Sequence, residues 1–416
     1  MLQQKYIITF ENRILKRWFK LIEKQTAILV KSPWLKITLL LTGSLTVMSG
    51  AVITAAIPDI SEHFADSRNA DLYSKLLLTL PSLFIAIFAP FAGRLIDHSG
   101  RLKVLRWALL LYAIGGTSGF FLSNIYFLLA GRALLGIAVA GIMTINTTLI
   151  GDYFQGKKRS NFMGWQGAFM GFGGVVFVSA GGVLADISWH WPFLVYSVSL
   201  VLLLMSWPFL YEPALNKQIK AISDKKRQVK NKKFLLLFTT AFFGMLFFYL
   251  VPTQIPFLLR QNPAIESSTI GFTISASVLA GALVSVVYGK IRTWLNFHQI
   301  YVLTFLLMGT GYLITAFLEG YSMILTGLIV AGLGTGMLMP NTNLWLVTLA
   351  PPERRGSMVG VLNTAVYSGQ FLSPVFAYPF IYFFSIKISF LICGCIMLLI
   401  SAWYFREDLI IKKNKI

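Results

Sequence analysis

A short polar segment between two long apolar runs carries side chains suited to electrostatic contacts. The segment is 91–103, FAGRLIDHSGRLK, in which Asp97 is followed by Gly100 and by the cations Arg101 and Lys103. Gly93 lies one helical turn before the acid. A carboxylate can bind a cation or the positive N-terminal end of a helix, and the latter contact is worth about 0.3–1 kcal/mol when exposed. The pattern therefore predicts reversible polar contacts where two helices end.

A second charged residue, Arg132, stands inside a long apolar run. An arginine within a membrane span costs roughly 2.5–3.5 kcal/mol, so we expect it to face a cavity or a partner. The alternative is an arginine that snorkels to the membrane interface from near the start of its helix. Acids, by contrast, lie only at the ends of the apolar runs, as Asp97, Asp152, Asp186 and Glu319 do.

The residues that usually carry catalysis or bind metals are scattered along the chain. The four histidines have no metal-ligand spacing, and no Ser/His/acid set or phosphate-binding loop is present. Cys393 and Cys395 lie within the last apolar run, where we expect inert thiols. The sequence therefore predicts no enzyme, no metal site and no cofactor.

The composition is that of a polytopic membrane protein. The chain has 416 residues, of which 56% are hydrophobic and only 12% charged, and its mean hydropathy is +0.70. A bilayer core needs about 20 mostly apolar residues per helix, and the apolar runs are too long for barrel strands. The net charge of +20 reflects membrane topology and contact with anionic lipid, not nucleic-acid binding, if Asp97 is cytoplasmic.

Twelve spans are expected, with both termini in the cytoplasm of a bacterial-type plasma membrane. They fall near 35–57, 76–95, 104–123, 126–150, 162–184, 192–210, 234–250, 269–288, 300–317, 323–349, 357–384 and 388–404. A basic segment, 1–34, precedes them as an interfacial helix or as a mobile tail. A basic linker, 211–233, separates the half 35–210 from the half 234–405, and a tail, 406–416, follows.

The two halves resemble copies of one another at a constant offset of 196 residues. Seven identities keep this offset: Gly93/Gly289, Gly115/Gly311, Gly131/Gly327, Gly136/Gly332, Met143/Met339, Arg159/Arg355 and Gly164/Gly360. Thr293 stands where Asp97 stands in the first half, so only the first half keeps the acid. The register predicts two parallel six-helix repeats.

The segment 91–103 resembles the loop between helices 2 and 3 of the major facilitator superfamily, with the pattern G-x-x-x-D-x-x-G-R-[KR]. Gly93, Asp97, Gly100 and Arg101 match, and Lys103 supplies the last cation one position late. The resemblance implies an alternating-access transporter whose loop gates the cytoplasmic side. Asp97 would then face the start of helix 11, near Gly356 and Ser357. Arg101 would bridge to Asp152.

Helices 4 and 5 resemble further motifs of this family. Gly131-Arg132-x-x-Leu135-Gly136 is similar to the motif whose arginine is implicated in proton coupling, with Leu135 in place of the usual Gln. Gly164, Gly173, Gly181 and Gly182 match the helix-5 motif of the antiporters, although Phe177-Val178 replaces its Gly-Pro. Generic close packing of helices is the alternative explanation of these glycines.

Helix 1 resembles the drug/proton antiporter pattern but lacks its acid. Ser49 stands at the position of the acid and Thr54 at the position of the Asn. A proton-carrying group at a helix end, coupling through Arg132 and water, and transport without protons all remain open.

By family analogy, polar residues of helices 1, 4, 7, 10 and 11 line the substrate path, though each could instead bond a neighbouring helix. They are Thr46, Ser49, Thr54, Asn146, Thr147, Gln254, Asn341, Asn343, Asn363, Tyr367 and Gln370. The resemblance favours a monomeric, proton-driven exporter of drugs or of a secreted metabolite such as a siderophore. Import or facilitated diffusion of a small polar or anionic nutrient is the alternative.

Overall fold

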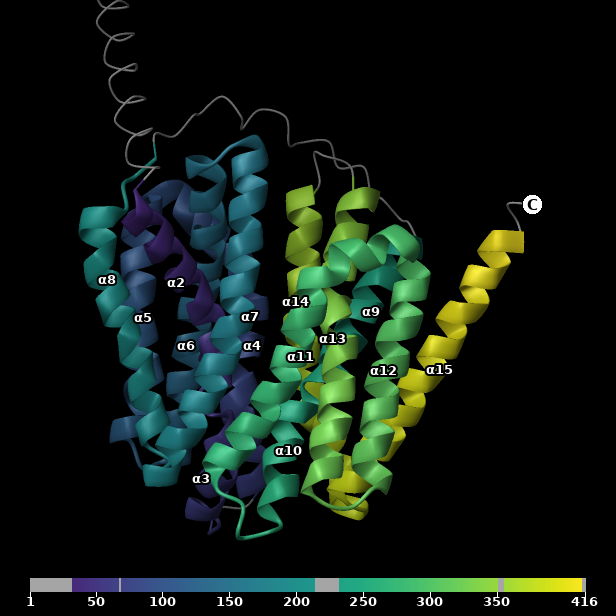
Figure 1. Cartoon of the computed structure of the whole chain (residues 1–416). Helices are drawn as coiled ribbons and strands as arrows, with labels where there is room; N and C mark the ends of the chain where they lie inside the picture. Colours follow the sequence, from purple (N-terminus) through teal and green to yellow (C-terminus); the bar gives the residue numbers. More distant parts are fainter. Residues whose placement is uncertain (1–31, 67–68, 214–231, 351–354, 414–416) are drawn as a thin grey trace, which may run out of the picture.

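The protein is an all-helical bundle of two halves that stand side by side (Figure 1). The computed structural model describes residues 32–66, 69–213, 232–350 and 355–413, and no strand occurs among them. The basic segment expected at 1–34 therefore lies almost wholly outside the described residues, as does most of the linker expected at 211–233.

The first half contains six crossings. They are α2 (Pro33–Ala51) with η1 (Thr54–Ala56) and α3 (Ile57–His63), then α4 (Ala70–Ser99), α5 (Arg101–Phe121), α6 (Ile125–Tyr153), α7 (Gly156–Ile187), and η2 (Trp191–Ser197) with α8 (Val198–Phe209).

The second half repeats this order. Its crossings are α9 (Lys232–Phe248) with α10 (Leu250–Arg260), then α11 (Ser267–Trp294), α12 (Phe297–Phe317), α13 (Tyr321–Leu349), α14 (Arg355–Phe383) and α15 (Ile386–Lys413). Eleven segments of the described chain are long and apolar enough to cross a membrane. The remaining crossing is α14, which packs against α4 and α9.

Several crossings extend beyond their expected ends, among them the first, the second and the last. The first crossing was expected to stop at Pro58, but Pro58 lies in the first turn of α3, where the missing N–H removes no helical hydrogen bond. The second was expected from residue 76, but α4 begins at Ala70 and so includes Lys75. The last continues to Lys413, although a tail was expected from residue 406.

Contacts inside the two halves repeat with the offset found in the sequence. A Cβ added at Gly115 would press on the carbonyl oxygen of Gly131, and one at Gly311 on that of Gly327. A second contact recurs in both halves, although not at this offset: Tyr112 of α5 donates its hydroxyl to Leu45 O at 2.8 Å, and Tyr312 of α12 donates to Phe247 O at 2.6 Å. The third helix of each half is thus tied to the first, and each half has its own hydrophobic core.

One carboxylate in each half bonds to the start of the third crossing, and these two carboxylates are also 196 residues apart. Glu212 accepts the backbone N–H of Arg101 at 2.7 Å and that of Leu102 at 2.9 Å, at the start of α5. Asp408 accepts the side-chain amides of Asn296 at 2.6 Å and Gln299 at 3.1 Å, at the start of α12. The difference 408 − 212 is 196, so in both halves a carboxylate in or just after the last helix bonds to the start of the third, through backbone N–H groups in the first half and side-chain amides in the second.

Candidate functional site between the halves

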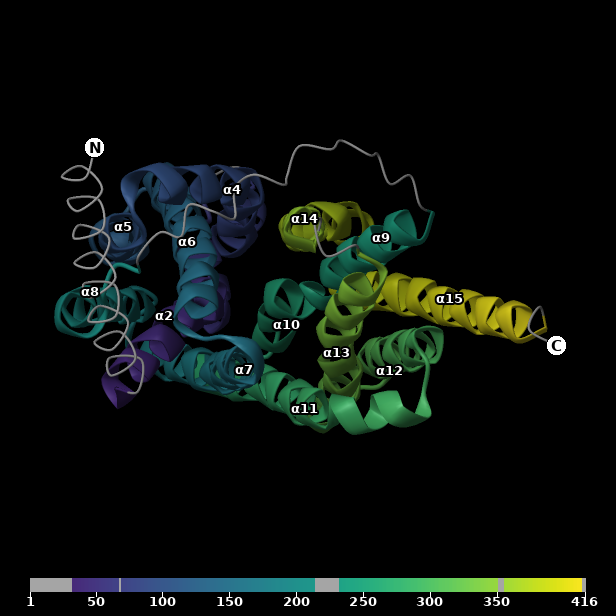
Figure 2. The same ribbon diagram turned by 90° about the horizontal axis from the view of Figure 1, so that it is seen from above.

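The two ends of the bundle carry opposite charge among the described residues. The basic face is the end where α2 begins and α15 ends; its cations include Arg101, Lys103, Arg106, Arg159, Lys232, Lys233, Lys290, Arg292 and Arg406. The acidic face is the opposite end; its acids are Asp59, Glu62, Asp66, Asp71, Asp186, Glu266 and Glu319. The halves meet through α4 against α14 and α7 against α11 (Figure 2).

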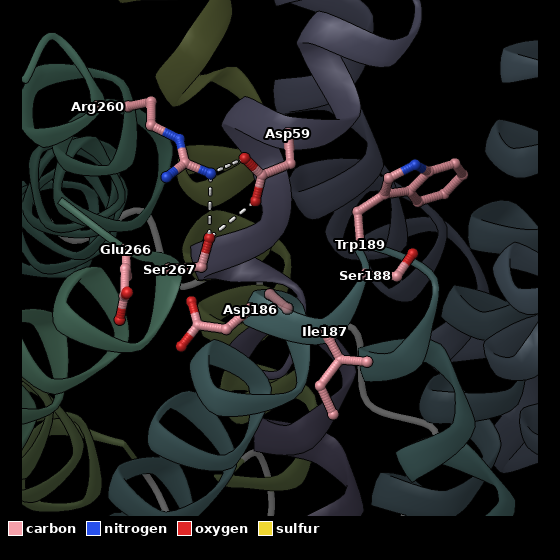
Figure 3. A pocket seen from close by; sticks show the side chains of 9 residues that line it. Asp59, Asp186, Ile187, Ser188, Trp189, Arg260, Glu266 and Ser267 are labelled. Atoms are coloured by element: carbon pink, nitrogen blue, oxygen red, sulfur yellow. Dashed lines mark hydrogen bonds and ion pairs between the residues drawn. The ribbon is translucent and has the colours of Figure 1, made fainter. Parts of the chain in front are cut away.

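At the acidic face, an ion pair joins the halves. Asp59 of α3 pairs with Arg260 of α10, and the Ser267 hydroxyl of α11 donates to the second Asp59 oxygen at 2.8 Å (Figure 3). Asp186 of α7 accepts the backbone N–H of Ser268 at 3.0 Å, which caps α11. Beside this cluster is a cavity of about 410 Å³. Two elements of the second half, α10 and α11, are thus held against α3 and α7.

Close glycine contacts complete the closure at the acidic face. A Cβ added at Gly182 of α7 would lie 2.6 Å from the carbonyl oxygen of Ser267 and 3.2 Å from the Cα of Gly271, both on α11. A Cβ at Gly181 would collide with the carbonyl oxygen of Val52. These two members of the predicted helix-5 motif therefore pack closely, whereas Gly173 meets its nearest neighbour, a Phe177 carbon, at 3.3 Å.

Near the middle of the bundle, polar side chains from both halves touch. Ser82 of α4 donates to the Gln370 side chain of α14 at 2.9 Å, and Tyr367 of α14 approaches the Met143 sulfur of α6 at 3.3 Å. The hydroxyl of Tyr249 lies 3.5 Å from the position of a Cβ at Gly50. We call Ser82, Met143, Tyr249, Tyr367 and Gln370 the central cluster.

At the basic face, the same four helices are apart. Among the described residues, and apart from each glycine's chain neighbours and own helix backbone, no atom lies within 4 Å of a Cβ added at Gly93 of α4, Gly164 of α7, Gly289 of α11 or Gly360 of α14. These are two of the pairs related by 196 residues. The halves are therefore packed together at the acidic face and separated at the basic face.

The polar loop at the basic face forms the predicted contact within the first half. Arg101 Nε lies 2.9 Å from Asp152 Oδ2, and Gly100 adopts a left-handed φ of +85° that admits the sharp turn between α4 and α5. Lys103 is exposed. The side chain of Asp97 and the start of α14, with Gly356 and Ser357, lie outside the described side chains, so the expected contact between them stays a prediction.

Arg132 is fully buried and does not snorkel to an interface. Its guanidinium carbon lies 4.6 Å from the ring centre of Phe193 and 4.8 Å from that of Tyr196, both in η2. Among the described residues, none of its nitrogens has a hydrogen-bond acceptor. The partners of this cation are therefore aromatic rings within the first half, which agrees with the expectation that Arg132 faces a cavity or a partner.

The other expected path residues divide into three groups. Asn146 and Gln254 are buried, and no described group bonds their amides. Ser49 and Thr54 donate to carbonyls of their own helical segment, at Thr46 and Gly50. Asn343, Thr147 and Asn363 are exposed or half-buried.

Asn341 is a correction to the expected path. Its amide donates to Phe297 O at 3.0 Å and its oxygen accepts the Tyr288 hydroxyl at 3.0 Å. Both partners belong to the second half, so Asn341 ties α13 to α11 and α12 and does not line a path between the halves.

Sequence inspection missed four charged residues that lie at the interface between the halves or beside the polar loop at the basic face. Asp59 and Arg260 lie at helix ends, Lys75 fell just outside an expected span, and Glu212 fell in the expected linker. Their individual positions give no signal of pairing, because each partner is more than 100 residues away along the chain or in the other half. For Glu212, the offset of 196 to Asp408 is a signal that could have been found.

The family model of the Major Facilitator Superfamily matches residues 39–296 and 236–415. The chain belongs to this superfamily. The arrangement of two six-helix halves, closed at one end and open at the other, is the fold of this major facilitator protein.

Two curated relatives and one solved structure show what this major facilitator protein resembles. It is 25% identical over 391 residues to the tetracycline resistance protein, class H, of Pasteurella multocida, covering 89% of this chain and 96% of the relative. It is 27% identical to a multi-drug resistance efflux pump PmrA homologue of Lactococcus lactis, over 68% and 72% of the two chains. The crystal structure of a D-xylose-proton symporter aligns with a TM-score of 0.73 at 15% identity, over 89% and 96%.

Proposed function

We propose that this transporter is a proton-coupled exporter in a bacterial-type plasma membrane, with its basic face and both termini in the cytoplasm. Cytoplasmic loops of membrane proteins carry an excess of Lys and Arg. On this orientation, the structure is open to the cytoplasm and closed to the outside. It is then the state that collects a compound for export.

The observation that carries the proposal is the asymmetry of the interface between the halves. Asp59 and Arg260 join the halves at the acidic face, while at the basic face glycines on all four interface helices meet no described atom of another helix within 4 Å of an added Cβ. A transporter must exchange two such states, and a gate held by a few polar contacts can open without a large loss of apolar packing. We propose that Gly93, Asp97, Gly100, Arg101, Lys103 and Asp152 form the gate that closes the basic face in the other state.

Export and substrate class rest on the relatives and on the central cluster. The tetracycline resistance protein and the multidrug efflux pump homologue match most of the chain. The central cluster offers a hydroxyl, an amide, a thioether and two phenols, and none of these groups is ionised at neutral pH. These features favour neutral or amphipathic molecules, which include drugs and secreted metabolites such as siderophores.

Import or facilitated diffusion of a small polar or anionic nutrient is the second candidate. It is favoured by Ser49, which stands where an antiporter acid is expected in helix 1. The structural neighbour named as a D-xylose-proton symporter has the same fold. In either case we propose a monomer that acts on small molecules, whose cations contact anionic lipid and not nucleic acid.

The test is a comparison of metabolites in medium and cytosol, for cells with and without the protein, with and without a protonophore. Export predicts compounds that leave only with the protein and only while the proton gradient is intact. Compounds that accumulate inside, or that move regardless of the gradient, would refute proton-driven export and support the second candidate.

A further inference from the structure

Lys75 is a buried cation at the interface between the halves. It lies in the outer third of α4, its residue is only 4% exposed, and its Nζ lies 4.3 Å from the ring centre of Phe257 on α10. It borders a cavity of about 700 Å³ that opens at the acidic face between α3, α4, α10 and α14. An ionisable side chain in a membrane span is costly, and such residues are commonly functional.

Every element that borders this cavity contributes charged or titratable groups around Lys75. On its own helix, Asp71 lies one turn away and accepts the Ser61 hydroxyl at 2.5 Å. Helix α3 contributes Glu62 and Asp59, α10 contributes Arg260, and α14 contributes the phenols of Tyr378 and Tyr382. Arg260 is already paired with Asp59. Asp71 is the carboxylate nearest to Lys75 in the sequence, and it can balance the charge of the Lys75 ammonium.

The surroundings of Lys75 must change when the acidic face opens. Phe257 belongs to the second half, so separating the halves removes the ring from the amine and admits water. Water stabilises the charged form of an amine, and its removal disfavours that form. The preferred protonation state of Lys75 therefore depends on which face of the transporter is open.

A row of polar groups connects Lys75 to the central cluster. Thr79 and Ser82 follow at intervals of four and three residues, which places all three side chains on one face of α4. Thr79 and Ser82 are buried. Ser82 reaches Gln370 of the other half. The row leads from the acidic face toward the side that is open in this structure.

We propose that Lys75 is the proton-carrying group of this transporter, in place of the carboxylate that helix 1 lacks. The proposal rests on the proposed function of proton-coupled export. With the acidic face open, the neutral amine takes a proton from a hydronium ion outside and releases water. When the acidic face closes, the desolvated ammonium returns the proton to water that reaches the central cluster from the basic face. One proton thus moves inward for each cycle in which a substrate moves outward.

The test measures the conformational equilibrium directly, because this needs no known substrate. Nitroxide labels at Ser123→Cys and Ser322→Cys, at the acidic face of different halves, report opening through their electron–electron distance. The background carries Cys393→Ala and Cys395→Ala, so that only these two sites are labelled. Measurements of the full chain in lipid nanodiscs run from pH 7.5 to 10. Carboxylates ordinarily titrate below this range, and burial with neighbouring His63 lowers the pKa of His190.

We expect the ratio of open to closed acidic face to fall as pH rises, by up to about tenfold per pH unit, the limit for one linked proton. Lys75→Gln and Lys75→Arg should each abolish this slope, since neither side chain titrates in the range. Lys387→Gln, which removes an exposed lysine at the same face, should keep it.

Two results would overturn the proposal. A Lys75 variant that shifts the ratio but keeps the slope would assign Lys75 a purely structural role against Phe257. A wild-type ratio that does not change with pH would exclude a linked proton at this site. Failure of proton-coupled export itself would appear separately, in the metabolite comparison, whatever the label distances show.

Discussion

At the scale of single residues, the Asp59–Arg260 pair is the contact that most directly sets the observed state. Its side chains are 19% and 29% exposed, so solvent screens the pair only in part. A pair of this exposure is worth about 1 kcal/mol, which corresponds to roughly a fivefold change in an equilibrium constant.

We therefore predict that Asp59→Asn and Arg260→Gln each shift the acidic face about fivefold toward opening. The double variant should shift it no further than the single ones, because both remove the same interaction. The label distance between Ser123→Cys and Ser322→Cys measures this shift. Additive effects of the two substitutions would show that the residues act independently. Lys387→Gln is the matched control, since its partner Glu319 belongs to the same half.

A second property of single residues concerns the phenol that follows α8. Burial, with nearby Asp152, raises the pKa of Tyr211 to about 12. Its phenol therefore stays neutral at physiological pH, and the charges beside it are those of Asp152 and of its neighbours Arg101 and Glu212.

At the scale of helices, the repeated carboxylate anchors make a symmetric prediction. Glu212 satisfies two N–H groups that the first turn of α5 leaves without partners, and Asp408 holds the capping residues of α12. Loss of a helix cap costs about 0.5–2 kcal/mol.

Glu212→Gln should therefore speed amide hydrogen exchange at the start of α5 by roughly 2–30-fold, and Asp408→Asn should do the same at the start of α12. Each effect should be confined to its own half, because the helix start that each carboxylate holds belongs to that half. Hydrogen-exchange mass spectrometry of the detergent-solubilised protein checks both. Glu407→Gln, one residue from Asp408, is the control. Equal exchange in variant and wild type would mean that the caps do not stabilise these helix starts.

At the scale of the whole molecule, two glycines of α7 affect different states of the transporter: one lies at the closed acidic face and the other at the open basic face. Gly182 packs against α11 at the closed acidic face, whereas no described residue of another helix contacts Gly164 at the open basic face. A side chain added at either position should destabilise only the state in which that end of α7 packs against the other half.

We predict that Gly182→Leu shifts the transporter toward an open acidic face, because the added side chain collides with the backbone of Ser267. Gly164→Leu should leave the observed state intact and disfavour closure of the basic face. Both substitutions should lower transport, but they should move the Ser123→Cys to Ser322→Cys distance differently: longer for the first, unchanged or more uniformly short for the second. A longer distance in the Gly164 variant would contradict the assignment of the two faces.

Much of this architecture follows from the sequence alone. Membrane spans are visible because lipid requires long apolar helices, and the offset of 196 residues identifies the two repeats. The pair Arg101–Asp152 was predicted from the loop motif and is found in the structure. The prediction of helix ends failed at Pro58, because a proline is tolerated in the first turn of a helix and Pro58 lies in the first turn of α3.

Only the tertiary structure decided which polar residues meet. Asn341 was expected in a path and instead joins three helices of its own half. Arg132 was expected to face a cavity or a partner, and its partners are two aromatic rings. Asp59 with Arg260, and Lys75 with Phe257, come together from opposite halves of the chain. Composition and periodicity report how each helix meets lipid, but the partner of a polar side chain depends on how separate helices are rotated and tilted against each other. That geometry is set by packing across the whole bundle and leaves no local mark in the sequence.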